Sequence, residues 1–282
     1  MLRRWPRCCG ASAARAESGG GPMEICALTP ELLTPTFAYL RRSPYRNALL
    51  LSNISQLRQS CDVLVAQHHE EIVGVASTYR DLPTPNFIFA AAYPSVAQQL
   101  LENLVARNPQ LRDRPVMALL PEDRFRQVRS FATLVDSEVE YQMGVEPDTL
   151  RMPDGPPARR LGQADLPAMS ALAEAAGLTV WHESTLGLGP AFGCFEGERL
   201  VAMAATHFAT PDVIEIGHVA THPDFRRRGY AKAATAALTQ AAFALAPRVF
   251  LMVLEENLPA RHTYRALGFQ AIESFHLARF LF

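Results

Sequence analysis

The chain has 282 residues, of which 49% are hydrophobic, and its 27 basic and 28 acidic residues give a formal net charge of −1. This length favours two domains, and the balanced charge excludes a polybasic surface for nucleic acid or anionic lipid. No apolar run approaches the ~20 residues of a membrane span, so we expect a soluble, cytoplasmic protein without membrane or nucleic-acid partners. The five cysteines lack a C-x-x-C pair, which argues against a metal cluster.

The N-terminal residues 1–22 are rich in arginine and glycine, and we expect a disordered extension. A targeting peptide would also be rich in arginine, but this segment is short and ends in glycines, which favours an inert extension. A first domain is then predicted over residues 23–146. Its expected elements are helices at 30–42, 47–57, 95–107 and 123–134 and strands at 63–67, 72–78, 86–92, 116–120 and 139–144.

Residues 147–157 contain four prolines and a glycine and are predicted to be a linker. A second domain is expected over residues 158–282. Its expected elements are a strand near Arg159, helices at 165–175, 230–245 and 259–267, and strands at 191–195, 200–208, 213–221, 249–254 and 269–281. The two domains show the same order of elements, which indicates a structural duplication.

A loop with the sequence VATHPDFRRRGYA, residues 219–231, connects a predicted strand to a predicted helix. The first turn of a helix presents N–H groups without intrahelical partners and the positive end of the helix dipole, so this location suits an anion. Gly229 lets the backbone approach a phosphate closely, and Ala231 leaves the first turn unobstructed. The loop also supplies three cationic donors, Arg226, Arg227 and Arg228. The pattern favours a pyrophosphate over a metal or a nucleobase.

This loop has the pattern V-x-T-x-P-x-x-R-x-x-G-x-A, and N-x-x-A-x-x-x-Y-x-x-x-G-F follows from Asn257 to Phe269. Together the motifs resemble the acyl-CoA-binding core of the GNAT-type N-acetyltransferases, most closely the glycine N-acyltransferase-like branch. The resemblance covers about residues 159–282. It implies an α/β (α+β) fold of the acyl-CoA N-acyltransferase type, with a mixed, mostly antiparallel central sheet flanked by helices and duplicated in two domains. The first domain has only Ala92-Tyr-Pro-Ser95 where the loop should be, so we expect a degenerate GNAT-like half.

The resemblance implies acetyl-CoA as the acyl-donor substrate, with no metal. The residues expected to contact it are Val219, Ala220, Thr221, Arg226, Arg227, Arg228, Gly229, Tyr230, Ala231 and Asn257. Asn257 is equally suited to cap the helix that it opens. Tyr264 lies where many members of the family carry the tyrosine that protonates the departing thiolate. The alternative for Tyr264 is a ring packed in the core with its hydroxyl on a backbone group.

Acyl transfer to an amine also needs a base, because an amine with a pKa of ~10 is mostly protonated at neutral pH. Glu215 is the first candidate, since a carboxylate within an apolar strand is costly unless it serves a cleft; the alternative is a carboxylate satisfied by neighbouring donors. Strand alternation places Glu215 on the face of Val219 and His218 on the opposite face, where we expect a packed core histidine. His182 and Glu183 are loop residues that are expected to be solvated.

We therefore expect an acyl-CoA-dependent N-acyltransferase that transfers an acetyl group from acetyl-CoA to a primary amine, either a small molecule or an amino-acid-like acceptor. The expected assembly is a monomer or a homodimer. The alternative is a non-catalytic acyl-CoA-binding regulatory module that keeps the loop and has lost the chemistry.

Overall fold

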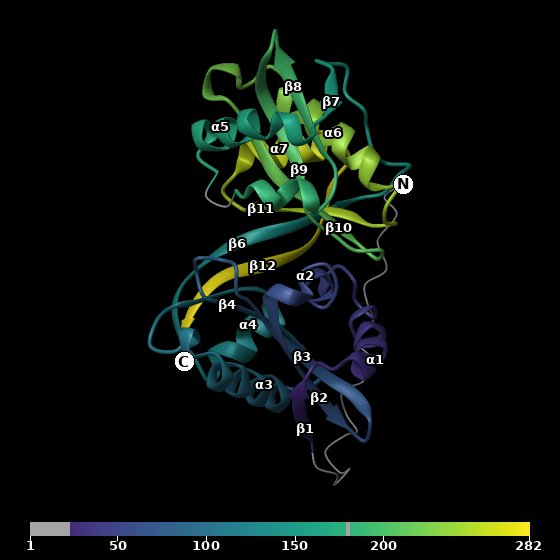
Figure 1. Cartoon of the computed structure of the whole chain (residues 1–282). Helices are drawn as coiled ribbons and strands as arrows, with labels where there is room; N and C mark the ends of the chain where they lie inside the picture. Colours follow the sequence, from purple (N-terminus) through teal and green to yellow (C-terminus); the bar gives the residue numbers. More distant parts are fainter. Residues whose placement is uncertain (1–22, 179–180) are drawn as a thin grey trace, which may run out of the picture.

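One continuous sheet of twelve strands runs through the whole molecule in the computed structural model, which describes residues 23–178 and 181–282 (Figure 1). The strands of the first half are β1 (Glu24–Ala27), β2 (Cys61–His68), β3 (Glu71–Tyr79), β4 (Asn86–Ala91), β5 (Val116–Pro121) and β6 (Thr133–Val145). Those of the second half are β7 (Ala158–Arg160), β8 (Ala191–Glu196), β9 (Arg199–Ala209), β10 (Ile214–Thr221), β11 (Val249–Leu254) and β12 (Gln270–Leu281). The prediction for residues 1–22 lies outside the described residues.

The helices flank this sheet in both halves. They are α1 (Pro30–Leu40), α2 (Ala48–Asn53), α3 (Pro94–Arg107), α4 (Glu122–Arg129), α5 (Leu166–Ala176), α6 (Tyr230–Ala242) and α7 (Leu258–Ala266). The predicted helix at 123–134 ends five residues earlier than expected, because the chain turns at Ser130 and enters β6 at Thr133.

The two halves repeat one strand order. The first half runs β1-β2-β3-β4-β5 from one edge of the sheet, and the second runs β7-β8-β9-β10-β11 from the other edge. In each half the last two strands of this series are parallel, and all other neighbouring pairs in the sheet are antiparallel. The predicted fold class, a mixed and mostly antiparallel sheet with a duplicated arrangement, is confirmed.

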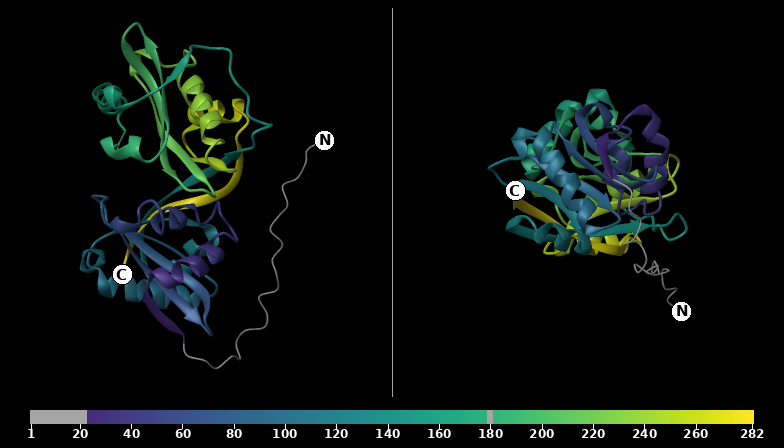
Figure 2. Two further views of the ribbon diagram at one scale, coloured as in Figure 1. Left: turned by 45° about the vertical axis from the view of Figure 1, so that its right-hand side comes forward. Right: turned by 90° about the horizontal axis from the view of Figure 1, so that it is seen from below.

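The halves exchange their final strands. β12 pairs with β5 of the first half, from Phe275↔Pro121 to Phe280↔Val116, while β6 pairs with β11 of the second half, from Glu140↔Leu254 to Val145↔Val249. β6 and β12 also pair with each other, and they run side by side between the halves in Figures 1 and 2. The exchange places residues of β6 next to the second half's central strands.

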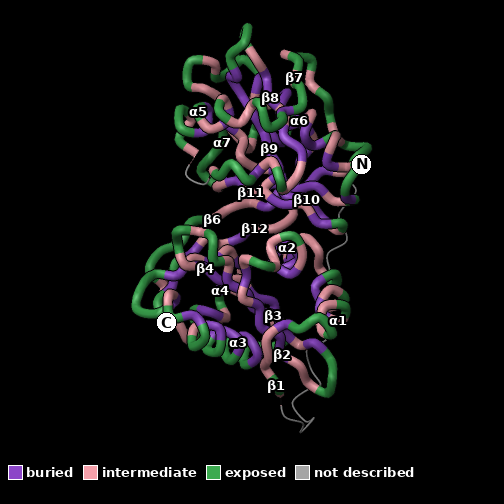
Figure 3. The backbone as a smooth tube through the Cα atoms, viewed as in Figure 1, coloured by how far each residue is buried: buried purple, intermediate pink, exposed green. Residues whose placement is uncertain are grey.

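Two hydrophobic clusters lie on opposite faces of the second half's sheet. Ile214 and Ile216 pack with α6 and α7 on one face, whereas Met203 and Ala205 pack with α5 on the other. A third cluster joins Phe208 and Phe250 of the second half to α1, α2 and strands of the first half. Buried positions therefore continue from one half into the other (Figure 3).

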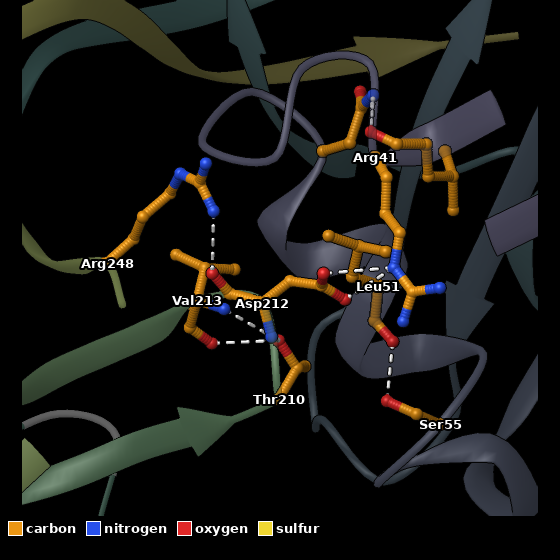
Figure 4. Close-up of polar contacts among 9 residues, drawn as sticks. Arg41, Leu51, Ser55, Thr210, Asp212, Val213 and Arg248 are labelled. Carbon is orange, nitrogen blue, oxygen red and sulfur yellow. Dashed lines mark hydrogen bonds and ion pairs between the residues drawn. The ribbon is translucent and has the colours of Figure 1, made fainter. Parts of the chain in front are cut away.

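A polar contact reinforces this boundary between the halves. The Arg41 Nε group donates to both carboxylate oxygens of Asp212 at 2.9 Å, and Arg248 donates to the Asp212 backbone carbonyl at 3.4 Å (Figure 4). Arg41 follows α1 and Asp212 precedes β10, so the pair ties the first half to the turn that leads into β10.

Candidate acyl-donor and catalytic site

β10 and β11 separate after a short paired segment. Their parallel register contains only Ile214↔Val249 and Glu215↔Phe250, although both strands continue beyond these pairs. Diverging strands expose backbone N–H and C=O groups along a gap, and an extended ligand can pair with such edges. The structure therefore has a gap between β10 and β11 beyond Glu215 and Phe250.

A β-bulge reshapes β10 beside this gap. In the ladder with β9, Gly217 pairs with Ala205 and Ala220 with Met203, so two residues of β10 lie opposite one residue of β9. His218 adopts a φ of +46°, which is uncommon for a residue with a Cβ atom. A bulge of this kind bends a strand and changes the direction of its side chains.

The bulge corrects the prediction from strand alternation. Val219 packs against the α6 side of the sheet, as Ile216 does, and not on the face of Glu215. His218 is not on the opposite face from Glu215: its ring lies 5.4 Å from the ring of His207, and His207 is hydrogen-bonded to Glu215. The extra residue at the bulge shifts the alternation by one position.

The arginine-containing loop joins β10 to α6. A short 3-10 turn covers Pro223–Phe225, and Gly229 is the N-cap of α6 with a φ of +85°. This left-handed conformation favours glycine, because a side chain there would be strained. The three predicted cationic side chains, Arg226, Arg227 and Arg228, are all exposed.

The other residues predicted to contact the acyl donor differ in how far they are buried. Tyr230 is 6% exposed and packs in the core, so only its backbone lies at the start of α6, while Ala231 is half-buried in the same turn. Ala220 is buried against the α5 side. The Thr221 hydroxyl oxygen is buried and has no hydrogen-bond partner within residues 23–178 and 181–282, which is costly unless a ligand supplies one.

Tyr264 and Asn257 lie on α7. Tyr264 is 7% exposed, it belongs to the cluster shared with α6, and burial raises the pKa of its hydroxyl to about 12. No hydrogen bond links that hydroxyl to any residue in the described ranges. The ring is thus packed in the core, but the hydroxyl lacks the backbone partner that the alternative for Tyr264 included. Asn257 caps α7, because its Oδ1 accepts a hydrogen bond from Ala260 N at 3.2 Å.

Glu215 lies on the opposite face of the sheet from Tyr264. Its side chain is 7% exposed, and His207 Nδ1 lies 2.8 Å from its Oε1. Burial by itself would lower the pKa of His207, but Glu215, through its charge and hydrogen bond, and the charge of Glu140 outweigh this effect and raise it. The buried carboxylate of Glu215 therefore has a hydrogen-bond donor, which agrees with the alternative of a carboxylate satisfied by its neighbours. That donor, His207, is itself titratable.

Glu140 joins this cluster from β6. Burial raises the pKa of its carboxyl to about 7, and the negative charges of Glu215 and Glu138 add to the effect while His207 opposes it. The ring of Trp181 packs edge-on against His218 at 5.5 Å, which extends the cluster towards the connection after α5.

Sequence reasoning missed His207, Glu140 and Trp181. The polar His207 in the mostly apolar strand β9 was a signal that could have been followed, because such a side chain needs a partner. Glu140 gave no signal, since its position depends on the strand exchange. His182 and Glu183 are both exposed, and His182 accepts a hydrogen bond from Ser184 N in a local turn.

Comparisons with known proteins agree with this geometry. Residues 163–269 match the Acetyltransferase (GNAT) family. This segment contains β10, the arginine-containing loop, α6 and Tyr264. A comparison with curated protein sequences gave no match.

Solved structures share the fold over most of the chain. A GCN5-related N-acetyltransferase from Kribbella flavida is 23% identical, with a TM-score of 0.62, over 82% of this chain and 94% of its own. A putative GNAT-family acetyltransferase from Novosphingobium aromaticivorans is 21% identical, with a TM-score of 0.60, over 82% and 95%. A tandem GNAT protein from the clavulanic acid biosynthesis pathway is 13% identical, with a TM-score of 0.62, over 92% and 98%. At these identities the likeness concerns the fold, including the tandem arrangement.

Within residues 23–178 and 181–282, no group of three or more His, Cys, Asp or Glu side chains is placed to hold a metal ion. No helix in the same ranges is long and apolar enough to cross a membrane.

Proposed function

We propose that this protein is an N-acetyltransferase that transfers the acetyl group of acetyl-CoA to a primary amine of a small or amino-acid-like molecule. The observation that carries the proposal is the gap between β10 and β11, which leads to the Gly229-capped start of α6. The gap suits the extended pantetheine arm, and the helix start with its three arginines suits the pyrophosphate.

The donor and the acceptor approach from different faces of the sheet in this proposal. The α6 face holds the CoA moiety and carries Tyr264, whereas Glu215 and Glu140 lie on the other face. Two carboxyl groups beside the gap attract a cationic amine. The first half covers part of this face, since Phe208 and Phe250 pack against it, and it would shape the acceptor pocket.

The reaction joins the amine nitrogen to the thioester carbonyl carbon and breaks the carbon–sulfur bond. In this proposal a backbone N–H near Val219, at the bulge, donates to the developing oxyanion. In this proposal the departing thiolate takes its proton from Tyr264, whose buried phenol is protonated at neutral pH.

Calorimetric titration with acetyl-CoA tests the donor site. Wild-type protein should bind, and Gly229→Val should not, because a β-branched residue at a φ of +85° distorts the start of α6. Gly197→Val is the matched control: Gly197 also has a positive φ, +58°, but lies in the β8–β9 turn, and this variant should bind normally. No binding by the wild type would refute the donor site.

Turnover is tested next, by following free thiol release with glycine, glutamine, ethanolamine, putrescine and benzylamine as acceptors. Amine-dependent release supports the transferase. Tight acetyl-CoA binding without turnover of any primary amine would instead favour the non-catalytic acyl-CoA-binding module.

A further inference from the structure

The buried carboxylate of Glu215 is hydrogen-bonded to an imidazole that is far more exposed. The Glu215 side chain is 7% exposed and that of His207 is 42% exposed, with 2.8 Å between Oε1 and Nδ1. An amine that approaches this face from solvent meets the imidazole edge before the carboxylate. The side chain best placed for proton transfer is therefore His207.

The hydrogen bond also determines which nitrogen of His207 is available. A carboxylate can only accept, so Nδ1 carries the hydrogen in this contact and Nε2 keeps its lone pair. The ring of His218 lies edge-on at 5.4 Å and limits the rotation of the imidazole. Glu215 thus fixes both the tautomer and the orientation of His207.

We infer that His207 Nε2 is the general base for acyl transfer and that Glu215 is its positioning residue, an inference that rests on the proposed N-acetyltransferase function. The ammonium form of the acceptor first gives one proton to solvent, because only the neutral amine has the lone pair that attacks. As the carbon–nitrogen bond forms, a second proton of that nitrogen moves to Nε2 and the imidazolium is stabilised by the Glu215 carboxylate. As the carbon–sulfur bond breaks, Tyr264 protonates the thiolate. The imidazolium then returns its proton to the Tyr264 phenolate through solvent, so that the products are the amide and free CoA.

Glu140 extends this arrangement across the two halves of the chain. It lies on β6, opposite Leu254 of β11 and Phe275 of β12, and its charge acts on His207 and Glu215. The charged and titratable groups around His207 are thus Glu215 and His218 from β10 and Glu140 from β6. Both carboxylates hold the pKa of His207 above its ordinary value, although burial opposes them.

The first test measures kcat/KM against pH with the most active acceptor of the amine panel. His207→Gln should lose roughly 100-fold or more, the usual contribution of a general base, and added imidazole should restore part of the rate. Glu140→Gln should lower kcat/KM, because it removes one of the two carboxyl groups that attract the amine, and it should move the acidic limb of the profile to lower pH. His69→Asn is the control; this exposed histidine lies in the β2–β3 turn, and its replacement should change nothing.

Two results would overturn the inference. One is a His207→Gln enzyme that turns over at the wild-type rate; the other is a Glu140→Gln profile that coincides with that of the wild type. Acetyl-CoA affinity is measured for every variant, so that a misfolded protein is recognised.

The second test needs no turnover and separates this inference from the proposed function. Nitrogen-15 NMR of the histidine rings should show His207 as the Nδ1–H tautomer, with a pKa above that of an unperturbed histidine. Its pKa should fall in Glu215→Gln and in Glu140→Gln. An Nε2–H tautomer, or a pKa unchanged by both substitutions, would refute the arrangement even if the protein acetylates amines. The predicted NMR result without turnover would sustain the Glu215–His207 pair and refute the transferase.

Discussion

Glu140→Gln should make the protein more stable at alkaline pH while leaving its stability at acidic pH nearly unchanged. Burial, with smaller contributions from Glu215 and Glu138, raises the pKa of Glu140 from its ordinary 4.5 to about 7. At 1.36 kcal/mol per pH unit, this difference corresponds to about 3 kcal/mol between the protonated and ionised forms in the folded state. Partial contact with solvent makes this an upper bound.

The sign follows from proton binding. Between pH 4.5 and 7 the folded protein holds a proton on Glu140 that the unfolded chain has lost, so the stability of the wild type falls as pH rises through this window. Glutamine mimics the protonated acid at every pH. The variant should therefore match the wild type at pH 5 and exceed it by about 2–3 kcal/mol at pH 8.5.

Urea unfolding followed by circular dichroism at the two pH values measures this difference. Glu198→Gln is the control, because Glu198 lies exposed in the β8–β9 turn, and it should behave as the wild type does at both pH values. The reasoning is wrong if Glu140→Gln has the same effect at pH 5 and at pH 8.5, or if it destabilises the protein at pH 8.5.

Three further substitutions test other parts of the structure. Tyr264→Phe should lower turnover by roughly 10- to 100-fold without changing the Kd for acetyl-CoA, and unchanged turnover would remove this tyrosine from the mechanism. Gly268→Ala should cost more than ~3 kcal/mol of folding free energy, measured by urea unfolding, because Gly268 has a φ of +100° and a Cβ atom would collide with the Thr149 carbonyl; near-wild-type stability would contradict this. Asp212→Asn should cost at most about 1 kcal/mol of folding free energy, since its partner Arg41 is 49% exposed. A double-mutant cycle with Arg41→Gln isolates the energy of the pair, and a coupling energy above about 1 kcal/mol would contradict this prediction.

The local sequence pattern was sufficient to predict an element where a single run of neighbouring residues determines it. The strand at 249–254 was predicted with its observed bounds, because a run of apolar residues is bounded by polar ones. The loop before α6 was recognised because Gly229 and its neighbours form a continuous motif, and its left-handed glycine is present in the structure. The short connection between β4 and α3, two residues where the second half has eight, also follows directly from the sequence.

Sequence reasoning failed where the position of a residue depends on segments that are distant in the sequence. Strand alternation could not anticipate the bulge at His218, because a bulge depends on how β9 and β10 pair. Glu140 approaches Glu215 only because β6 leaves its own half and pairs with β11. His207 was overlooked because its importance comes from the 2.8 Å contact with Glu215, which local periodicity does not reveal.

The exchanged strands have a consequence for how the polypeptide acquires its structure. β5 is synthesised early, but its neighbour β12 comprises Gln270–Leu281, so one edge of the first half waits for this late segment during translation. Long-range pairing of this kind slows folding and leaves an unpaired edge that is prone to aggregation. The nascent chain is therefore vulnerable from the synthesis of β5 until β12 leaves the ribosome, and a co-translational chaperone would act in that interval.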